Sequence, residues 1–433
     1  MKYPLLILAA LFGAGWYLSV PHDTLLAVHD LWTFRRQAIP LSGLLLIGFM
    51  AAGGVLATRL SLIERWLGGL DRVYRLHKRL GIAAGVLVLL HWQLEWLPKQ
   101  LAKLHLIVGP LRHGAKAPPP AWRELAGLAG EWAGYIMMAL VVIALLKRVP
   151  YRAFRLVHKA FGVICLMGAY HSAIFIPAEW WRAPAGVLGG LSIALMVLVG
   201  VWSLSGRIGQ QRRIDAVVET LENEADDTLL LHCKPLGHWP GHKAGQFALL
   251  TTDRKEGAHP FTIASHWQDG GELCFGIKGL GDYTRELATR LQPGMAVTIE
   301  GPYGGFDFGT ADKPQIWVAG GIGITPFLAR LEELAARGGG TAAVECFYCS
   351  NDQQSAAFGS RLEALARQAG VTLHRWDSQR EGRLEASRLQ PLMSADTEVW
   401  FCGPAAFGHH LRQGLQAQGL AAEAFHAEAF NWR

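Results

Sequence analysis

Two apolar stretches decide the fold: HKRLGIAAGVLVLLH at residues 77–91 and HKAFGVICLMGAYH at residues 158–171. Each stretch begins and ends with a histidine. An imidazole in the core of a bilayer is costly unless it is paired or bound to a metal, so a histidine inside a membrane span is a candidate functional residue. Two histidines on each of two spans therefore predict two buried sites at different depths.

The spacing of the first pair supports this interpretation. His91 follows His77 by fourteen residues, which gives a rise of about 21 Å and a rotation only about 40° short of four turns. Both rings therefore leave one face of the helix at opposite depths.

The second pair is less regular. His171 follows His158 by thirteen residues, about 140° short of four turns. This helix needs a bend or a local change of winding, for which Gly162 and Gly168 are candidates. Facing histidines at matched depths predict two haems, each with two axial imidazoles.

The composition divides the chain into a membrane part and a soluble part. It has 433 residues, 51% of them hydrophobic, and a mean hydropathy of +0.20, which is too long for one domain and too apolar for a soluble protein. The net charge of +6 comes from basic residues beside apolar segments, so we expect no nucleic-acid partner. Six cysteines show neither a disulfide framework nor an iron–sulfur spacing, and Cys346 and Cys349 are expected to be structural.

Six segments are long and apolar enough to be spans: residues 4–20, 40–58, 79–97, 132–147, 156–176 and 186–205. The first lacks a convincing signal-peptide cleavage site and is kept as a span. With the N-terminus inside, the inner loops carry fifteen Lys and Arg residues and the outer loops eight. This bias predicts that the N-terminus and the soluble half lie in the cytoplasm. It also pairs His77 with His158 on the inner side and His91 with His171 on the outer side. The expected location is the plasma membrane, of the bacterial inner-membrane type.

The composition changes after Arg213. Up to residue 308, short alternating runs (IDAVVET, DTLLLHCK, GQFALLTT, ELCFGIKG, MAVTIEG) predict an antiparallel β-barrel. From residue 314, apolar strands alternate with helical stretches, which predicts an α/β domain with a parallel sheet. We therefore expect a multi-domain chain: a six-helix transmembrane bundle at 1–206, the β-barrel at 207–310 and the α/β domain at 311–433.

A glycine-rich turn opens the α/β part. The stretch VAGGIGITPF, residues 318–327, follows a strand and begins a helix. Gly320, Gly321 and Gly323 allow the backbone to approach a phosphate, and the amides of the helix N-terminus attract it. The turn therefore predicts a nucleotide site.

The stretch HPFTIAS, residues 259–265, resembles the flavin-contact motif of the ferredoxin-NADP reductase superfamily, in the form found in NADPH oxidases and ferric reductases. Further similar stretches follow the family's order: GQF at 245–247, IKGLGDYT at 277–284, GPYG at 301–304, the glycine turn, CGP at 402–404 and Phe430. With the four histidines, the resemblance covers roughly residues 40–433.

The resemblance implies FAD, two b-type haems and NADPH or NADH as cofactors, and it assigns roles to residues. The flavin would be lined by His259, Pro260, Phe261 and Thr262, with Thr262 near its reactive nitrogen, and its phosphates bound by Lys278, Gly281 and Thr284. The pyrophosphate of the nicotinamide nucleotide would meet Gly320, Gly321, Gly323, Thr325 and Pro326, and its nicotinamide end Cys402 and Gly403. Phe430 would cover the flavin ring until nicotinamide displaces it. The expected catalytic residues are Thr262, Cys402 and Phe430.

Two departures concern the nucleotide and the chain end. Asn351 stands where an arginine that binds the 2′-phosphate of NADPH is expected. Arg375, Arg380 and Arg383 are alternative candidates for that contact, so the sequence only favours NADPH over NADH. Three residues, Asn431, Trp432 and Arg433, follow Phe430 and either restrain its ring or substitute for it.

The implied activity is transmembrane electron transfer from cytoplasmic NAD(P)H to an acceptor on the outer face. Oxygen, giving superoxide, is the first candidate acceptor, and a ferric chelate is the second. A third interpretation is an electron-transfer subunit for a partner protein, although the sequence shows no recognisable docking feature.

Overall fold

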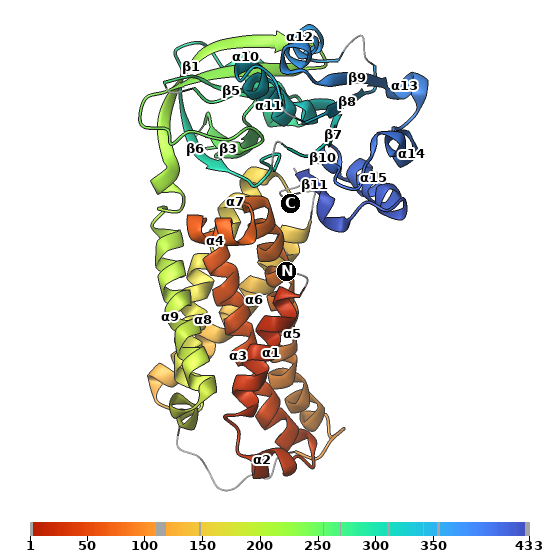
Figure 1. Cartoon of the computed structure of the whole chain (residues 1–433). Helices are drawn as coiled ribbons and strands as arrows, with labels where there is room; N and C mark the ends of the chain where they lie inside the picture. Colours follow the sequence, from red (N-terminus) through yellow and green to blue (C-terminus); the bar gives the residue numbers. More distant parts are fainter. Residues whose placement is uncertain are drawn as a thin grey trace. The chain divides into compact units, whose positions relative to one another are not determined.

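The computed structural model describes residues 3–109, 118–146, 149–253, 255–268, 270–309, 312–340, 342–352 and 356–428. These residues form two compact units (Figure 1). The first contains the chain up to Glu64 and then Arg72–Ile208. The second contains Arg65–Asp71 and the chain from Gly209 onward.

The first unit is helical. Its helices are α1 (Pro4–Tyr17), α2 (His22–Leu26), α3 (Leu31–Ala57), α5 (Leu70–Lys103), α6 (Ala121–Leu145), α7 (Tyr151–His158), α8 (Phe161–Phe175), the 3-10 helix η1 (Ala178–Arg182) and α9 (Pro184–Leu204), and α4 (Ser61–Leu67) crosses the boundary between units. Within the described residues, five segments are long and apolar enough to cross a membrane: α3, α5, α6, Arg152–Phe175 and α9. Large apolar side chains such as Val86, Leu90, Val142 and Leu198 are exposed on them, as expected of surfaces that face lipid.

The first of the six predicted spans, residues 4–20, is shorter than predicted. Helix α1 has 14 residues, a length of about 21 Å, against about 30 Å for the hydrocarbon core. The Ser19 hydroxyl donates to the carbonyl of Gly15, and Pro21 follows without an amide hydrogen to continue the helix. A bundle of six full spans is therefore not seen.

The histidine-bearing segment Arg152–Phe175 changes its winding directly after His158. The amide of Ala160 donates to Val157 O at 3.0 Å and that of Gly162 to Lys159 O at 3.1 Å, which are bonds to the third preceding residue. Each such step turns about 20° further than an α-helical step and offsets part of the missing rotation between the two histidines. The change of winding was expected; it is centred on Lys159–Ala160, extends to the amide of Gly162 and does not involve Gly168.

The N-terminal half of the second unit is an antiparallel half-barrel. It contains η2 (Gln210–Arg212), β1 (Arg213–Glu224), β2 (Thr228–Pro235), β3 (Phe247–Thr251), β4 (His259–Thr262), β5 (Leu273–Lys278), α10 (Asp282–Arg290) and β6 (Ala296–Tyr303). The strand order is β4-β3-β6-β1-β2-β5. A bridge between Ile263 and Phe275 links the two edges of this sheet and partly closes it. The predicted antiparallel character is confirmed, and β4 is an additional strand formed by the HPFT motif.

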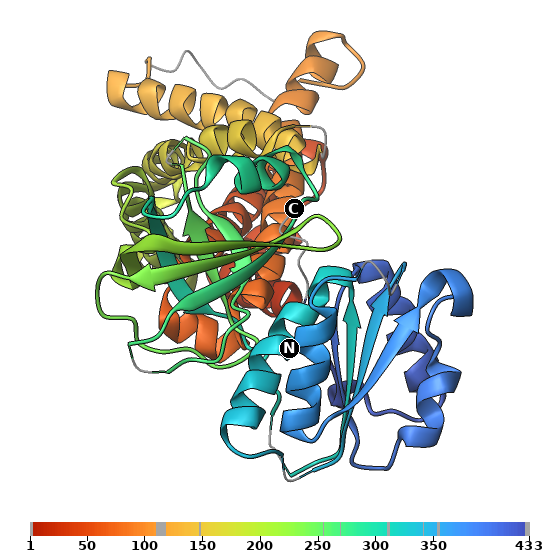
Figure 2. The same cartoon turned by 90° about the horizontal axis from the view of Figure 1, so that it is seen from above.

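The remaining elements form an α/β fold around a parallel sheet. They are β7 (Gln315–Gly320), η3 (Gly321–Ile324), α11 (Thr325–Ala336), β8 (Val344–Ser350), α12 (Gly359–Ala369), β9 (Thr372–Asp377), α13 (Ser378–Glu381), α14 (Ala386–Leu389), η4 (Gln390–Leu392), β10 (Glu398–Cys402), α15 (Ala405–Ala417), η5 (Ala422–Ala424) and β11 (Phe425–Glu428). The strand order is β11-β10-β7-β8-β9. Figure 2 shows α11 and α12 on one face of this sheet and α15 on the other, and apolar side chains fill both faces. The predicted parallel sheet is confirmed, with β11 as an unexpected edge strand.

Helices α8 and α9 approach closely because glycines face each other. A Cβ atom at Gly200 would lie 2.9 Å from the Gly162 carbonyl oxygen and 3.1 Å from Leu166 Cδ2. Small residues of this kind let the backbones of membrane helices pack against one another.

We therefore expect Gly200→Leu to separate α8 from α9 and to destabilise the first unit by about 1–3 kcal/mol. The melting temperature of the detergent-solubilised protein measures this effect. Gly81→Leu, where a Cβ atom meets nothing within 4 Å, is the matched control. An equal melting temperature for the two variants would contradict the packing argument.

Candidate functional site

The first pair of histidines lies between α5 and α7. The His77 and His158 ring centroids are 6.0 Å apart, with the ring planes at 76°. Nδ1 of His77 lies 2.9 Å from the carbonyl oxygen of Gly53 on α3. Because a carbonyl can only accept, His77 donates from Nδ1 and leaves Nε2 unprotonated. The His158 ring packs between Phe154 and Phe161.

The second pair is held in a similar way. Nδ1 of His171 lies 2.9 Å from the carbonyl oxygen of Ala126 on α6, so this ring also donates from Nδ1. The helix can come so close because residue 130 is glycine: a Cβ atom there would lie 2.2 Å from His171 Nδ1. Nδ1 of His91 lies 2.9 Å from the hydroxyl of Ser42 on α3.

These two pairs fit the axial ligands of haem. An imidazole that binds a metal almost always donates its other ring N–H to a protein acceptor, as the rings of His77 and His171 do here. Two metal–nitrogen bonds of about 2 Å, with the ring radii added, require centroids about 6 Å apart, which matches the inner pair. Among the described residues, no group of three or more His, Cys, Asp or Glu side chains forms a metal site. Each pair therefore offers two ligands, the number that a planar porphyrin leaves open.

The predicted flavin strand, β4, pairs with β3 at the edge of the half-barrel. The His259 ring stacks on Tyr283 of α10, with centroids 4.2 Å apart and planes at 21°, and Phe261 packs against the barrel core. The Thr262 hydroxyl is buried and has no hydrogen-bond partner among the described residues. A buried polar atom without a partner is costly, so this hydroxyl fits a site completed by a ligand with polar ring atoms.

The predicted phosphate-binding residues gather at the start of α10. The amide of Gly281 donates to Thr284 Oγ1 at 3.0 Å, and that hydroxyl donates to Gly281 O, which fixes the first turn. The free amides of this turn can bind an anion. Lys278 forms an ion pair with Asp226 at the end of β5, so a phosphate there would compete with Asp226 for this charge.

The glycine turn meets the end of strand β10. A Cβ atom at Gly323 would lie 2.2 Å from Cys402 O, and one at Gly320 would lie 2.8 Å from Pro404. Gly321 has φ +56°, a conformation that favours glycine. Because β7 and β10 are parallel neighbours, the predicted turn and the predicted nicotinamide residues Cys402 and Gly403 share one end of the sheet.

The side chain of Thr325 is used within the protein. Its hydroxyl donates to Ile322 O at 3.1 Å, and its methyl group packs on Gly276 of β5, where a Cβ atom would lie 2.5 Å from it. Thr325 and Pro326 begin α11. Of the predicted pyrophosphate ligands, these two would therefore contribute the backbone of the first helical turn and not their side chains.

A buried carboxyl group beside Cys402 escaped the sequence analysis. Glu428 on β11 pairs in register with Cys402 on β10. Burial raises the pKa of the Glu428 carboxyl well above its usual range, and burial likewise raises the pKa of the Cys402 thiol. A raised pKa disfavours the thiolate of Cys402, which is the nucleophilic form of a cysteine. The sequence feature that could have indicated this carboxyl group is the single acidic residue in the run AFHAEAF, residues 424–430. Phe430, the predicted residue over the flavin ring, belongs to the same run but lies outside the described residues.

The candidates for nucleotide preference lie on or near β8 and β9. Arg375 forms an ion pair with Glu363 at 2.7 Å, and Arg380 approaches Asp377 at 3.6 Å. Asn351 accepts a hydrogen bond at its carbonyl from the amide of Gln379. Arg380 therefore lies on α13, a short helix that is hydrogen-bonded through Gln379 to Asn351. Asn351 is the position at which an arginine for the 2′-phosphate was expected.

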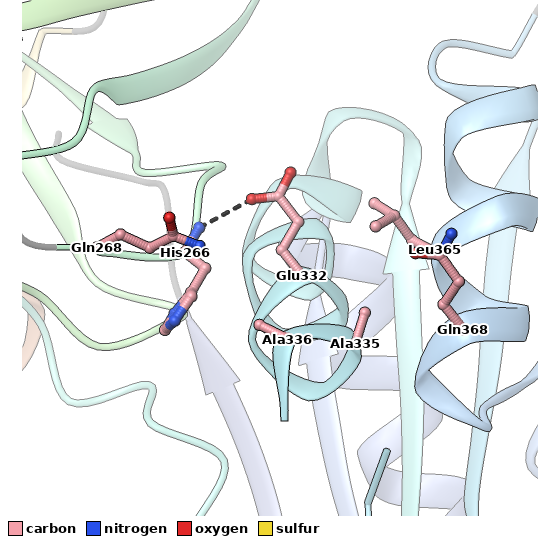
Figure 3. A pocket seen from close by; sticks show the side chains of 7 residues that line it. All are labelled: His266, Gln268, Glu332, Ala335, Ala336, Leu365 and Gln368. Atoms are coloured by element: carbon pink, nitrogen blue, oxygen red, sulfur yellow. Dashed lines mark hydrogen bonds between the residues drawn. The ribbon is translucent and has the colours of Figure 1, made fainter. Parts of the chain in front are cut away.

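A cavity of about 350 Å³ lies between the half-barrel and the α/β part (Figure 3). It is lined by His266, Gln268, Glu332, Ala335, Ala336, Leu365 and Gln368. The amide of His266 donates to Glu332 Oε2 at 2.9 Å. Glu332 lies toward the C-terminal end of α11, whereas the glycine turn lies directly before the N-terminal end of this helix. The cavity is therefore separate from the predicted nucleotide site.

Comparison with family models matches two parts of the chain. Residues 42–169 match the model described as ferric reductase like transmembrane component, and residues 214–306 match an FAD-binding domain. The first match includes His77, His91 and His158 and ends two residues before His171.

Individual relatives are an oxidoreductase and a reductase component by name. Vanillate O-demethylase oxidoreductase from Pseudomonas putida is 28% identical over 210 residues, 47% of this chain and 64% of that protein. The ferredoxin reductase component of 3-ketosteroid-9-alpha-monooxygenase from Mycobacterium tuberculosis is 33% identical over 30% of this chain and 37% of that protein. The chain thus spans between about a third and two thirds of the length of these relatives. A flavohemoglobin structure from Malassezia yamatoensis, with bound FAD and heme, has a TM-score of 0.51 at 18% identity, with 93% of this chain and 96% of that chain covered; this likeness concerns the fold alone.

Glu428 provides a test by pH. A carboxyl group whose pKa is raised on folding stabilises the protein below its unfolded pKa, and this contribution is lost as pH rises through the folded pKa. We expect Glu428→Gln to remove this loss, so its melting temperature should exceed that of wild type increasingly as pH rises from 5 to 8. The gain is about 1.4 kcal/mol per unit of pKa shift.

Flavin fluorescence of the purified full chain follows the melting. Glu423→Gln, at an exposed position of η5, is the control and should keep the wild-type pH dependence. Parallel pH profiles for wild type and Glu428→Gln would contradict the assignment of a buried, protonated carboxyl group.

Proposed function

Because the chain belongs to the ferric reductase-like proteins, with a transmembrane component joined to an FAD-binding domain, we propose that it carries electrons from cytoplasmic NAD(P)H through FAD and two b-type haems to an acceptor outside the membrane. It is a multi-pass membrane flavo-oxidoreductase with NAD(P)H as donor; the haems, their ligands and the acceptor are the proposal. The observation that carries it is the orientation of His77, His91 and His171, whose Nδ1 atoms are all engaged on neighbouring helices.

In this proposal His77 and His158 hold the inner haem and His91 and His171 the outer one. His91 follows His77 by fourteen residues and His171 follows His158 by thirteen, so the two ligand pairs would lie about 20 Å apart along their helices. Helix α1 is a sixth membrane element, shorter than the five spans. The excess of basic residues on the inner loops supports a cytoplasmic N-terminus and soluble unit.

The soluble half binds FAD and the nicotinamide nucleotide. Flavin contacts are assigned to His259, Pro260, Phe261 and Thr262, with phosphate contacts from Lys278, Gly281 and Thr284. The nucleotide is assigned to Gly320, Gly321, Gly323, Thr325, Pro326, Cys402 and Gly403, with Phe430 over the flavin ring. The buried hydroxyl of Thr262 and the close approach of Gly323 to Cys402 support these assignments.

The chemistry belongs to the bound cofactors, and the protein positions them. When bound, FAD takes a hydride from NAD(P)H and releases its electrons singly, and haem iron carries single electrons across the membrane. With His77 and His158 on one iron and His91 and His171 on the other, neither haem would have a position open for a substrate. The acceptor would then take its electron from the edge of the group held by His91 and His171. Oxygen, giving superoxide, is the proposed acceptor, and the family match favours a ferric chelate as the second candidate.

Cytochrome c reduction by the purified protein with NAD(P)H distinguishes the two acceptors. Superoxide is a diffusible intermediate, so superoxide dismutase should abolish most of the cytochrome c signal. A signal that is insensitive to the dismutase, together with fast reduction of a ferric chelate, would assign the protein as a ferric reductase.

His91→Leu tests the ligand assignment. The variant loses one axial ligand, so we expect it to retain one haem instead of two while FAD content and NAD(P)H diaphorase activity stay at the wild-type level. The optical spectrum of the reduced protein and a pyridine haemochrome assay measure this loss. His29→Leu, at an exposed position before α3, is the control; wild-type haem content in His91→Leu would show that the ligand is a different residue.

A further inference from the structure

The acceptor for His91 differs from those of the other rings. His77 and His171 donate to backbone carbonyls, whereas His91 lies 2.9 Å from a side-chain hydroxyl, that of Ser42. We infer that Ser42 is a positioning residue that fixes the ring of His91 and lowers the reduction potential of the haem bound there. This inference rests on the proposed haem function.

The hydrogen-bond roles follow from the number of protons. The hydroxyl of Ser42 donates to the carbonyl oxygen of Ile39 at 3.0 Å. A serine hydroxyl has a single proton, so toward His91 it can only accept. His91 therefore donates from Nδ1 and presents an unprotonated Nε2, the same tautomer as His77 and His171.

The site is built to hold this bond. Ser42 is 8% exposed, so little water is available to replace the hydroxyl. The next residue is Gly43, where a Cβ atom would lie 3.3 Å from His91 Cε1, so a larger side chain there would press on the ring. The nearby carboxylate of Glu95 is already occupied by ion pairs with Arg35 and Lys99.

The bond also affects the metal. A partner that accepts from Nδ1–H makes the imidazole more basic, which favours the oxidised form of iron and lowers its reduction potential. Removal of the hydroxyl of Ser42 takes away the acceptor at 2.9 Å and should reverse this effect. Ser42 is also the acceptor that a substitution can remove, because those of His77 and His171 are main-chain atoms.

The test is a redox titration of the full-length protein with Ser42→Ala. We expect two haem components in wild type and a shift of only one of them in the variant. The shifted component should become easier to reduce by about tenfold in its equilibrium constant, about 59 mV for one electron. Loss of that haem alone, with the other component unchanged, also supports the inference. The electron paramagnetic resonance spectrum of the oxidised protein should change for the same single haem.

Two further variants separate this role from general packing. Ser42→Thr keeps the hydroxyl and should stay close to wild type. Ser192→Ala on α9 removes a hydroxyl of similar burial that donates to Leu188 O and contacts no histidine, and it should leave both components unchanged. An unshifted titration and spectrum in Ser42→Ala, or an equal shift of both haems, would overturn the inference. A wild-type protein without two haem components would instead overturn the proposed function.

Discussion

The hydrogen bond from a histidine Nδ1 to a neighbouring helix is the interaction on which the membrane unit depends. A buried polar ring is costly in hydrocarbon unless its N–H is satisfied. Helix α3 provides acceptors for both rings of α5, because Ser42 and Gly53 are eleven residues apart and lie about 20° apart around that helix. Helix α6 provides the acceptor for His171. The hydrogen bonds to the histidine rings thus add fixed contacts between α3 and α5 and between α6 and α8 to the apolar packing of these helices.

The arrangement is unequal at the two depths. Both outer rings have a hydrogen-bonded acceptor, whereas the inner ring of His158 is packed between Phe154 and Phe161 and makes no hydrogen bond within the described residues. His158 also ends α7, just before the tightened turn at Lys159–Ala160. The irregular segment of the backbone therefore coincides with the ring that lacks polar support.

The sequence predicted whatever follows from local spacing. The apolar runs, the antiparallel and parallel sheets and the need for a change of winding between His158 and His171 could all be predicted from periodicity and residue type. The position of that change could not, because Gly162 faces α9 and the winding tightens at Lys159–Ala160 instead. Helix α1 was overestimated because hydropathy did not register that Ser19 and Pro21 end it.

Contacts between distant residues were beyond the sequence. Ser42 and His91 are 49 positions apart, and a serine in an apolar helix has no feature that points to a particular histidine. Glu428 was missed for the same reason, since its burial depends on its neighbours in the sheet. The stacking of His259 on Tyr283 likewise joins a strand to a helix that only the fold brings together.

The burial of every cysteine has a consequence for survival near oxygen. All six are free and buried, and burial raises the pKa of the five thiols outside the spans. Peroxide attacks thiolates at accessible positions, so protonated thiols inside the protein react slowly. A flavoprotein that leaks reduced oxygen would thus carry no easily damaged sulfhydryl of its own, and its working lifetime would be limited by something other than cysteine oxidation.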